Sequence, residues 1–150
     1  MNAKVKAIEE IADKHIFRIN QALDNLKDTF PISAQLIPNL SIEQIFSLEM
    51  LTSRFAKLQD HLGANVIDLF FELNDENADQ LTMIDKLNKL EKLRIIEDAH
   101  LWREMRKARN IIEHEYPDKP DLIANTLNLI HDYCPKLMSI KQKLFAQMHK

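Results

Sequence analysis

The chain has 150 residues, of which 45% are hydrophobic and 29% are charged, and this balance excludes an intrinsically disordered protein. Its length predicts a single domain over residues 1–150 that can bury a hydrophobic core without disulfides. The net charge of −3 does not indicate nucleic acid as a partner, so such a partner would need a local basic patch.

Apolar residues recur every three or four positions along most of the chain, a spacing typical of amphipathic helices. A single glycine and five prolines also favour long helices over a turn-rich β fold. Ser41 and Gln44 have the spacing of a capping box, and Pro120 suits the first turn of a helix. The expected helices cover about residues 3–29, 41–62, 78–93, 98–116 and 120–148.

Two residues decide how many helices these segments form. Gly63 either ends the second helix or only bends it, because the apolar segment VIDLFFEL follows at once. Pro135 is expected to kink the last helix, because it removes one backbone hydrogen bond.

Inward positions are expected at Ile45, Leu48, Leu51 or Thr52, Phe55, Leu58, Leu81, Ile84, Leu87 and Leu90. The sequence therefore predicts an all-α, up-and-down bundle of five to six helices.

Three features predict a cytoplasmic protein that does not enter a membrane. Cys134 is the only cysteine, which excludes an internal disulfide and fits a reducing compartment. The N-terminal segment MNAKVKAIEEIADKH is too charged for a signal peptide. No apolar run approaches the roughly 18 residues that a membrane-spanning helix needs.

The helix predicted over residues 98–116 combines an apolar side with the most basic surface of the chain. We expect Leu101, Trp102, Met105, Ala108, Ile111 and Ile112 to face the bundle. We expect the opposite side to carry His100, Arg103, Arg106, Lys107, Arg109, Asn110 and His114. Such a face could contact a phosphate backbone, with Arg103, Arg106 and Lys107 as candidates for RNA binding. It could equally be a solvated helix face whose charge is balanced by neighbouring acidic residues.

The end of this helix carries residue types that suit RNA cleavage. Asn110 and His114 are four residues apart and share a face, whereas Arg109 and His114 are roughly 140° apart and could only flank a groove. The negative end of the helix dipole and the acidic neighbours Glu113 and Glu115 favour a charged imidazole at His114. Histidine can transfer a proton, and arginine can stabilise extra charge on phosphate. A packing role for His114 and Tyr116 remains open.

The segment RNIIEHEY, residues 109–116, resembles the R-x4-H-x-Y motif of HEPN-domain toxins, the HepT-like proteins. Arg109, Asn110, His114 and Tyr116 match that motif without departure. The upstream segments RFAKLQDHLG and LNKLEKL are also similar to this family, so the resemblance extends over about residues 40–145.

The resemblance implies a HEPN-like homodimer in which the motif helices of two protomers meet at a composite cleft. It implies a metal-independent endoribonuclease without cofactors, in which Arg109 and His114 are catalytic and Asn110 supports or orients them. It further implies a minimal nucleotidyltransferase as antitoxin, with Tyr116 as the expected acceptor of AMP. The added phosphate and adenine would then block the cleft by charge and bulk.

Two other functions remain open: a non-catalytic HEPN-like partner or nucleotide-binding module for a nucleotidyltransferase, and a helical interaction domain. Glu97 and His100 have the E-x-x-H spacing of di-iron bundles, but such sites need a second copy and two further glutamates, so no metal site is predicted. Cys134 is expected to be a packed thiol. Asp60 and Arg54 of the second helix are expected either to form a buried polar contact that supports the motif helix or to lie exposed.

Overall fold

The computed structural model describes residues 2–74, 77–114 and 118–150, and within these ranges every regular element is helical. The result confirms the prediction of an all-α bundle of five to six helices. The α-helices are α1 (Asn2–Asn25), α2 (Ile42–His61), α3 (Ile67–Asn74), α4 (Met83–Lys92), α5 (Ala99–Glu113) and α6 (Pro120–Met148).

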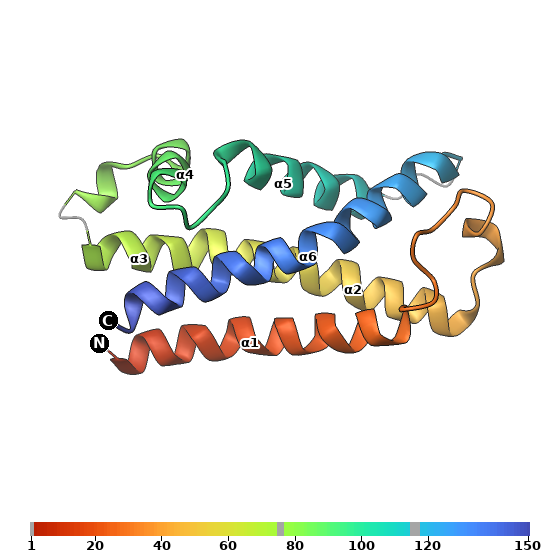
Figure 1. The fold of residues 1–150 in the computed structure, drawn as a ribbon, viewed down its shortest axis with the longest axis horizontal. Coiled ribbons are helices and arrows are strands. Elements are labelled where there is room, and N and C mark those ends of the chain that lie inside the picture. The colour runs from red at the N-terminus through yellow and green to blue at the C-terminus, as the bar shows by residue number, and fades with distance from the viewer. Residues whose placement is uncertain (1, 75–76, 115–117) are drawn as a thin grey trace.

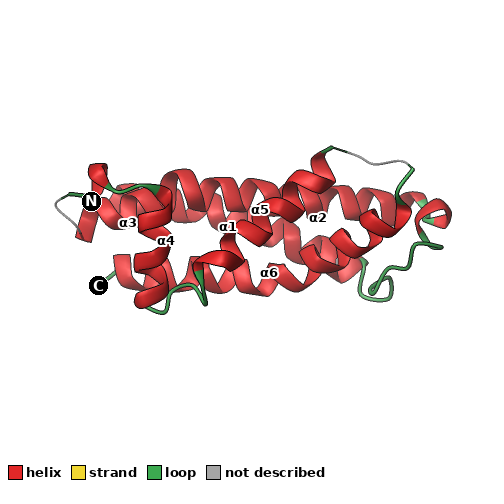
Figure 2. Cartoon of the chain, turned by 90° about the horizontal axis from the view of Figure 1, so that it is seen from above, coloured by secondary structure: helices red, strands yellow, loops and turns green. Residues whose placement is uncertain are grey.

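The helices form an elongated bundle whose two termini lie at the same end (Figure 1). Helix α1 packs along α2, and α6 runs back diagonally over both. Helix α5 lies against α2 and α6, while the short α4 is seen nearly end-on beside it. The view from above in Figure 2 shows the same long, narrow arrangement. No helix in the described ranges has both the length and the apolar character that crossing a membrane would require.

The local signals in the sequence mark the helix ends that they predicted. The Ser41 hydroxyl accepts a hydrogen bond from the Gln44 amide at 3.1 Å, and the Gln44 side chain accepts one from the Ser41 amide at 2.9 Å. This reciprocal pair is the capping box that begins α2. Pro120 begins α6, as expected, and Pro135 lies inside that helix.

Gly63 bends the helical run and does not end it. A π-helical segment, Leu62–Val66, joins α2 to α3 without a loop. A Cβ added at Gly63 would lie 3.2 Å from Cζ2 of Trp102, which is buried in α5. A side chain at this position would press against Trp102, so the glycine favours the close approach of α5 to this segment.

Several boundaries and inward positions differ from those expected. Helix α1 ends at Asn25 rather than near residue 29, and α4 begins at Met83 after a separate 3₁₀ turn over Ala78–Gln80. Ile84 is 58% exposed and Ile45 is 36% exposed, so the prediction that they face the core was wrong. Periodicity identifies one face of a helix, but it does not reveal how far a neighbouring helix extends over that face.

Candidate functional site on helix α5

Helix α5 is fixed at its start by a side-chain cap and along its length by burial. The Asp98 carboxylate accepts a hydrogen bond from the Leu101 amide at 2.7 Å and caps the helix, whose start was expected at about residue 98. Trp102, Met105 and Ala108 are buried in the bundle. Because this side is held by packing, the rotation of α5 determines where each predicted site residue lies.

On its outer side, α5 carries a hollow of about 350 Å³, which we call the basic hollow. It brings together the three candidate RNA-binding cations and two of the predicted catalytic residues. Its lining consists of Arg103, Arg106, Lys107, Asn110, Ile111 and His114. All of these except Ile111 are exposed, so the hollow is open and positively charged.

Arg109 lies on the opposite flank of α5, against α2, and its side chain is only 17% exposed. Its Nη2 contacts the Asp60 carboxylate at 2.7 Å and the Glu113 carboxylate at 3.3 Å. Its Nη1 donates to the Asn110 side-chain oxygen at 3.2 Å, whereas Nε is buried without a hydrogen-bond acceptor. The guanidinium is therefore held in place by acceptors from α2 and α5.

A second hollow, of about 520 Å³, lies beside this ion pair between α2 and α5, and we call it the α2–α5 hollow. Arg109, Asp60 and Glu113 belong to its lining. The α2 side also contributes Glu49, Ser53 and Lys57. This hollow therefore combines two cations with three carboxylates, whereas the charged lining of the basic hollow is entirely cationic.

Arg109 and His114 line different hollows of the single chain. Arg109 thus differs from its expected place on the open basic face, because it lies at the edge of the buried side of α5 and reaches toward Asp60. Asn110 links the two flanks, since it accepts a hydrogen bond from Arg109 and also lines the hollow that contains His114. Tyr116, the predicted AMP acceptor, and Glu115 lie outside the described residues.

The contacts and burial of the other residues considered in the sequence indicate structural roles. Asp60 contacts Arg109 of the motif helix, but its side chain is 47% exposed, so the contact is not a buried one, and Arg54 instead contacts Nδ1 of His15 at 3.2 Å. Burial raises the pKa of the Cys134 thiol to about 12, as befits a packed cysteine. Trp102 is buried, and Tyr133 is half-buried with a pKa raised mainly by burial and also by Glu104. The described residues contain no group of three or more side chains suited to a metal ion.

Two supports of α5 were not anticipated from the sequence. Gln59 is fully buried, and its side-chain amide donates to the backbone oxygen of Trp102 at 3.2 Å. Glu113 contacts Arg109 one helical turn earlier, a spacing at which side chains on a helix regularly meet. The second contact could have been found from spacing alone, whereas the first joins residues that are 43 positions apart.

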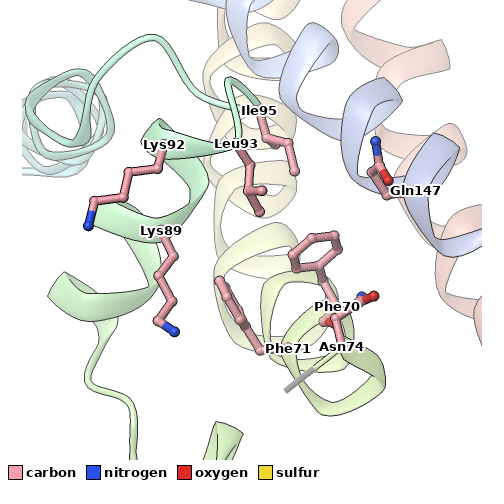
Figure 3. A pocket seen from close by; sticks show the side chains of 8 residues that line it. All are labelled: Phe70, Phe71, Asn74, Lys89, Lys92, Leu93, Ile95 and Gln147. Atoms are coloured by element: carbon pink, nitrogen blue, oxygen red, sulfur yellow. The ribbon is translucent and has the colours of Figure 1, made fainter.

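A further cavity of about 440 Å³ lies at the other end of the bundle, between α3, α4 and α6 (Figure 3). Phe70 and Phe71 form part of its apolar wall, and Gln147 of α6 also lines it. Lys92 also lines the cavity, although its ammonium group extends away from the phenyl rings. None of the predicted site residues lines this cavity, so the candidate site remains on α5.

Comparison with known proteins gives no match to a family model, to a curated protein or to a solved structure.

Proposed function

We propose that this chain is a cytoplasmic, metal-independent endoribonuclease toxin of the HEPN type that acts as a homodimer. The observation that carries the proposal is the combination of Asn110 and His114 with three cations in one open hollow. A single-stranded RNA needs such a cationic surface for its phosphates and a proton-transferring group beside it. The R-x4-H-x-Y pattern supplies the reason to assign this surface to cleavage rather than to general solvation.

The proposed reaction is transfer of a phosphodiester to the neighbouring ribose hydroxyl. His114 removes the proton from the 2′-hydroxyl, whose oxygen then attacks phosphorus and displaces the 5′-oxygen of the next nucleotide. A protonated histidine, supplied by the second protomer, returns a proton to that leaving oxygen. Arg109 stabilises the additional negative charge on the phosphate in the transition state. The products are a 2′,3′-cyclic phosphate and a 5′-hydroxyl.

The proposed site is composite, because Arg109 and His114 line different hollows within one chain. Two motif helices that meet in a dimer would bring two histidines and two arginines to one cleft. One pair could then serve as acid and base while the arginines bind phosphate. The half-buried position of Arg109 favours this division, because Asp60 holds the guanidinium at a fixed place.

A minimal nucleotidyltransferase is the proposed antitoxin, and Tyr116 is the proposed acceptor of AMP. Tyr116 follows His114 by two residues in the sequence, so a nucleotide attached there would add its charge and bulk to the motif that contains His114. Co-expression with the nucleotidyltransferase encoded nearest to the toxin should add the mass of one AMP to the wild type and to Tyr133→Phe. The same mass on Tyr116→Phe would refute this acceptor.

The nuclease is tested by comparing two histidines of the same helix. We expect His114→Ala to lower RNA cleavage by roughly 100-fold or more, the usual contribution of a general acid or base. His100, which is exposed and contacts Glu104 at 3.2 Å, provides the matched control, and His100→Ala should keep full activity. Purified protein should cleave single-stranded RNA in the presence of EDTA. In bacteria, the wild type and His100→Ala should arrest growth, whereas His114→Ala should not. Equal activity of His114→Ala and the wild type would overturn the nuclease.

One observation favours the alternative of a non-catalytic HEPN-like partner for a nucleotidyltransferase. Arg109 already contacts two carboxylates, so its charge is largely neutralised within the single chain. In that case the basic hollow would bind nucleotide phosphates without cleaving RNA. A wild type that binds ATP and the nucleotidyltransferase, but leaves RNA intact, would establish this alternative.

A further inference from the structure

An apolar patch covers the outer face of the N-terminal half of α2. Ile42 is 64% exposed, Phe46 is 63% exposed and Met50 is 40% exposed. These three residues are spaced by four and therefore follow one side of the helix, with Ile45 beside them. Large apolar side chains gathered in this way mark an interaction surface, whereas scattered ones are ordinary.

The same face of α2 carries a symmetric arrangement of charge. Glu43, Met50 and Lys57 are spaced by seven residues, and at 100° per residue they lie almost on one line along the helix. Glu43 and Lys57 are both exposed, and each lies about 10.5 Å from Met50 along the axis at a rise of 1.5 Å per residue. A helix with this pattern is complementary to an antiparallel copy of itself.

We infer that the outer face of α2 is the dimer surface and that a two-fold axis passes beside Met50. In this arrangement Glu43 faces Lys57 of the partner subunit, and the symmetry repeats the contact on the other side. Phe46 and Met50 of both chains form the apolar centre, with the two ion pairs as its rim. The occupant of the patch is thus a second copy of this chain, because an antiparallel copy places a lysine opposite Glu43 and a glutamate opposite Lys57.

This surface continues into the candidate site. Ser53, one helical turn from Met50, lines the same hollow as Arg109 and Glu113. A two-fold axis at Met50 therefore brings the C-terminal turns of both α5 helices toward the same dimer interface. The inference rests on the proposed homodimeric nuclease and specifies which surface assembles its composite cleft.

Met50→Cys tests the axis directly. A residue beside a two-fold axis meets its own copy, so the variant should form a disulfide-linked dimer of twice the 17.6 kDa chain mass on mild oxidation. The native Cys134 is buried, and its pKa of about 12 keeps it unreactive. Phe17→Cys is the matched control, because Phe17 is 58% exposed on α1, and this variant should remain monomeric on a denaturing gel. Equal crosslinking of both variants, or of neither, would overturn the inference.

Charge reversal tests the ion pairs independently. Glu43→Lys and Lys57→Glu should each raise the dimer dissociation constant by about tenfold, since each replaces two attractive contacts with two repulsive ones. The double variant should restore dimerisation when measured by analytical ultracentrifugation. A double variant that is as weak as the single ones would refute the pairing. Failure of the proposed nuclease activity can be distinguished from failure of the proposed dimer surface. A Met50→Cys protein that forms the crosslinked dimer but does not cleave RNA would support the surface and contradict the nuclease.

Discussion

Two cations in this protein have almost the same immediate surroundings, although they lie in different parts of the bundle. Arg109 of α5 is 17% exposed and contacts the carboxylates of Asp60 and Glu113. Lys141 of α6 is 14% exposed and contacts Glu9 at 3.0 Å and Asp13 at 2.8 Å, both in α1. Burial and two carboxylates therefore do not identify a functional cation.

The wider surroundings separate the two clusters. Both carboxylates at Lys141 come from α1, and His149 near the end of the chain contacts Glu9 at 2.7 Å, so the cluster joins α1 to α6. Arg109 instead borders a hollow of about 520 Å³, and its neighbour Asn110 lines a second hollow that contains three cations. The first arrangement stabilises the packing of two helices, whereas the second leaves space for a ligand.

The largest expected difference concerns the rate of RNA cleavage after an exchange that keeps the charge. Arg109→Lys should lower the cleavage rate by roughly 100-fold, because lysine cannot bind phosphate through two parallel donors. Lys141→Arg should leave the rate unchanged, because that cluster is remote from the proposed cleft. Single-turnover cleavage of a labelled RNA measures both effects, and helicity by circular dichroism confirms that both variants fold. Similar rates for the two variants would remove the functional distinction between the clusters.

The features of the fold and of the candidate site that could be predicted from the sequence are those that depend on residues close together in the chain. Ser41 and Gln44 begin α2, Asp98 begins α5 and Pro120 begins α6, because capping and the fixed backbone angle of proline act within one turn. The basic side of α5 also followed from helical spacing. These features can be predicted without knowing where the other helices lie.

The remaining features depend on contacts between distant parts of the chain. Asp60 meets Arg109 across 49 positions, and Lys141 meets Glu9 across 132 positions, so no local pattern could choose between these and other charged pairs. Ile84 looked like a core residue by periodicity, but in α4 it is Leu87 and Leu90 that are buried. The separation of Arg109 from His114 followed from helical spacing, whereas the contact of Arg109 with Asp60 depends on the position of α2.

Replacing Glu9 is expected to have a smaller effect, and this effect is on the free energy of unfolding. Burial alone would raise the pKa of Glu9, but hydrogen bonds from His149 and Lys141 outweigh it, and the pKa lies below its ordinary value of 4.5. Glu9→Gln should therefore lower the free energy of unfolding by about 1–2 kcal/mol at neutral pH. A lowered pKa stabilises the fold above the unfolded-state value, and this contribution disappears as the pH falls through the folded-state value.

Urea unfolding of Glu9→Gln and the wild type across pH 7 to about pH 3 measures this dependence. The difference in unfolding free energy should shrink once the pH falls below about 4.5, the ordinary value for glutamate. Asp85→Asn is a useful comparison because Asp85 also has a lowered pKa, caused by hydrogen bonds from Thr82 at an exposed helix cap. A difference at Glu9 that persists unchanged in acid would contradict an electrostatic origin.

The smallest expected effect is on stability at Asp60. Its side chain is 47% exposed, whereas that of Glu9 is 24% exposed, so water and salt screen the Asp60–Arg109 pair more strongly. Asp60→Asn should lower the free energy of unfolding by about 0.5–1 kcal/mol at low salt, and near 1 M NaCl, where the Debye length is about 3 Å, most of that loss should vanish. The loss at Glu9→Gln should change less over the same salt range, because the Glu9 carboxylate is less exposed than that of Asp60. If salt weakened both pairs equally, screening would not follow the exposure of the carboxylates, and the Asp60–Arg109 pair would be as well protected from salt as the Glu9–Lys141 pair.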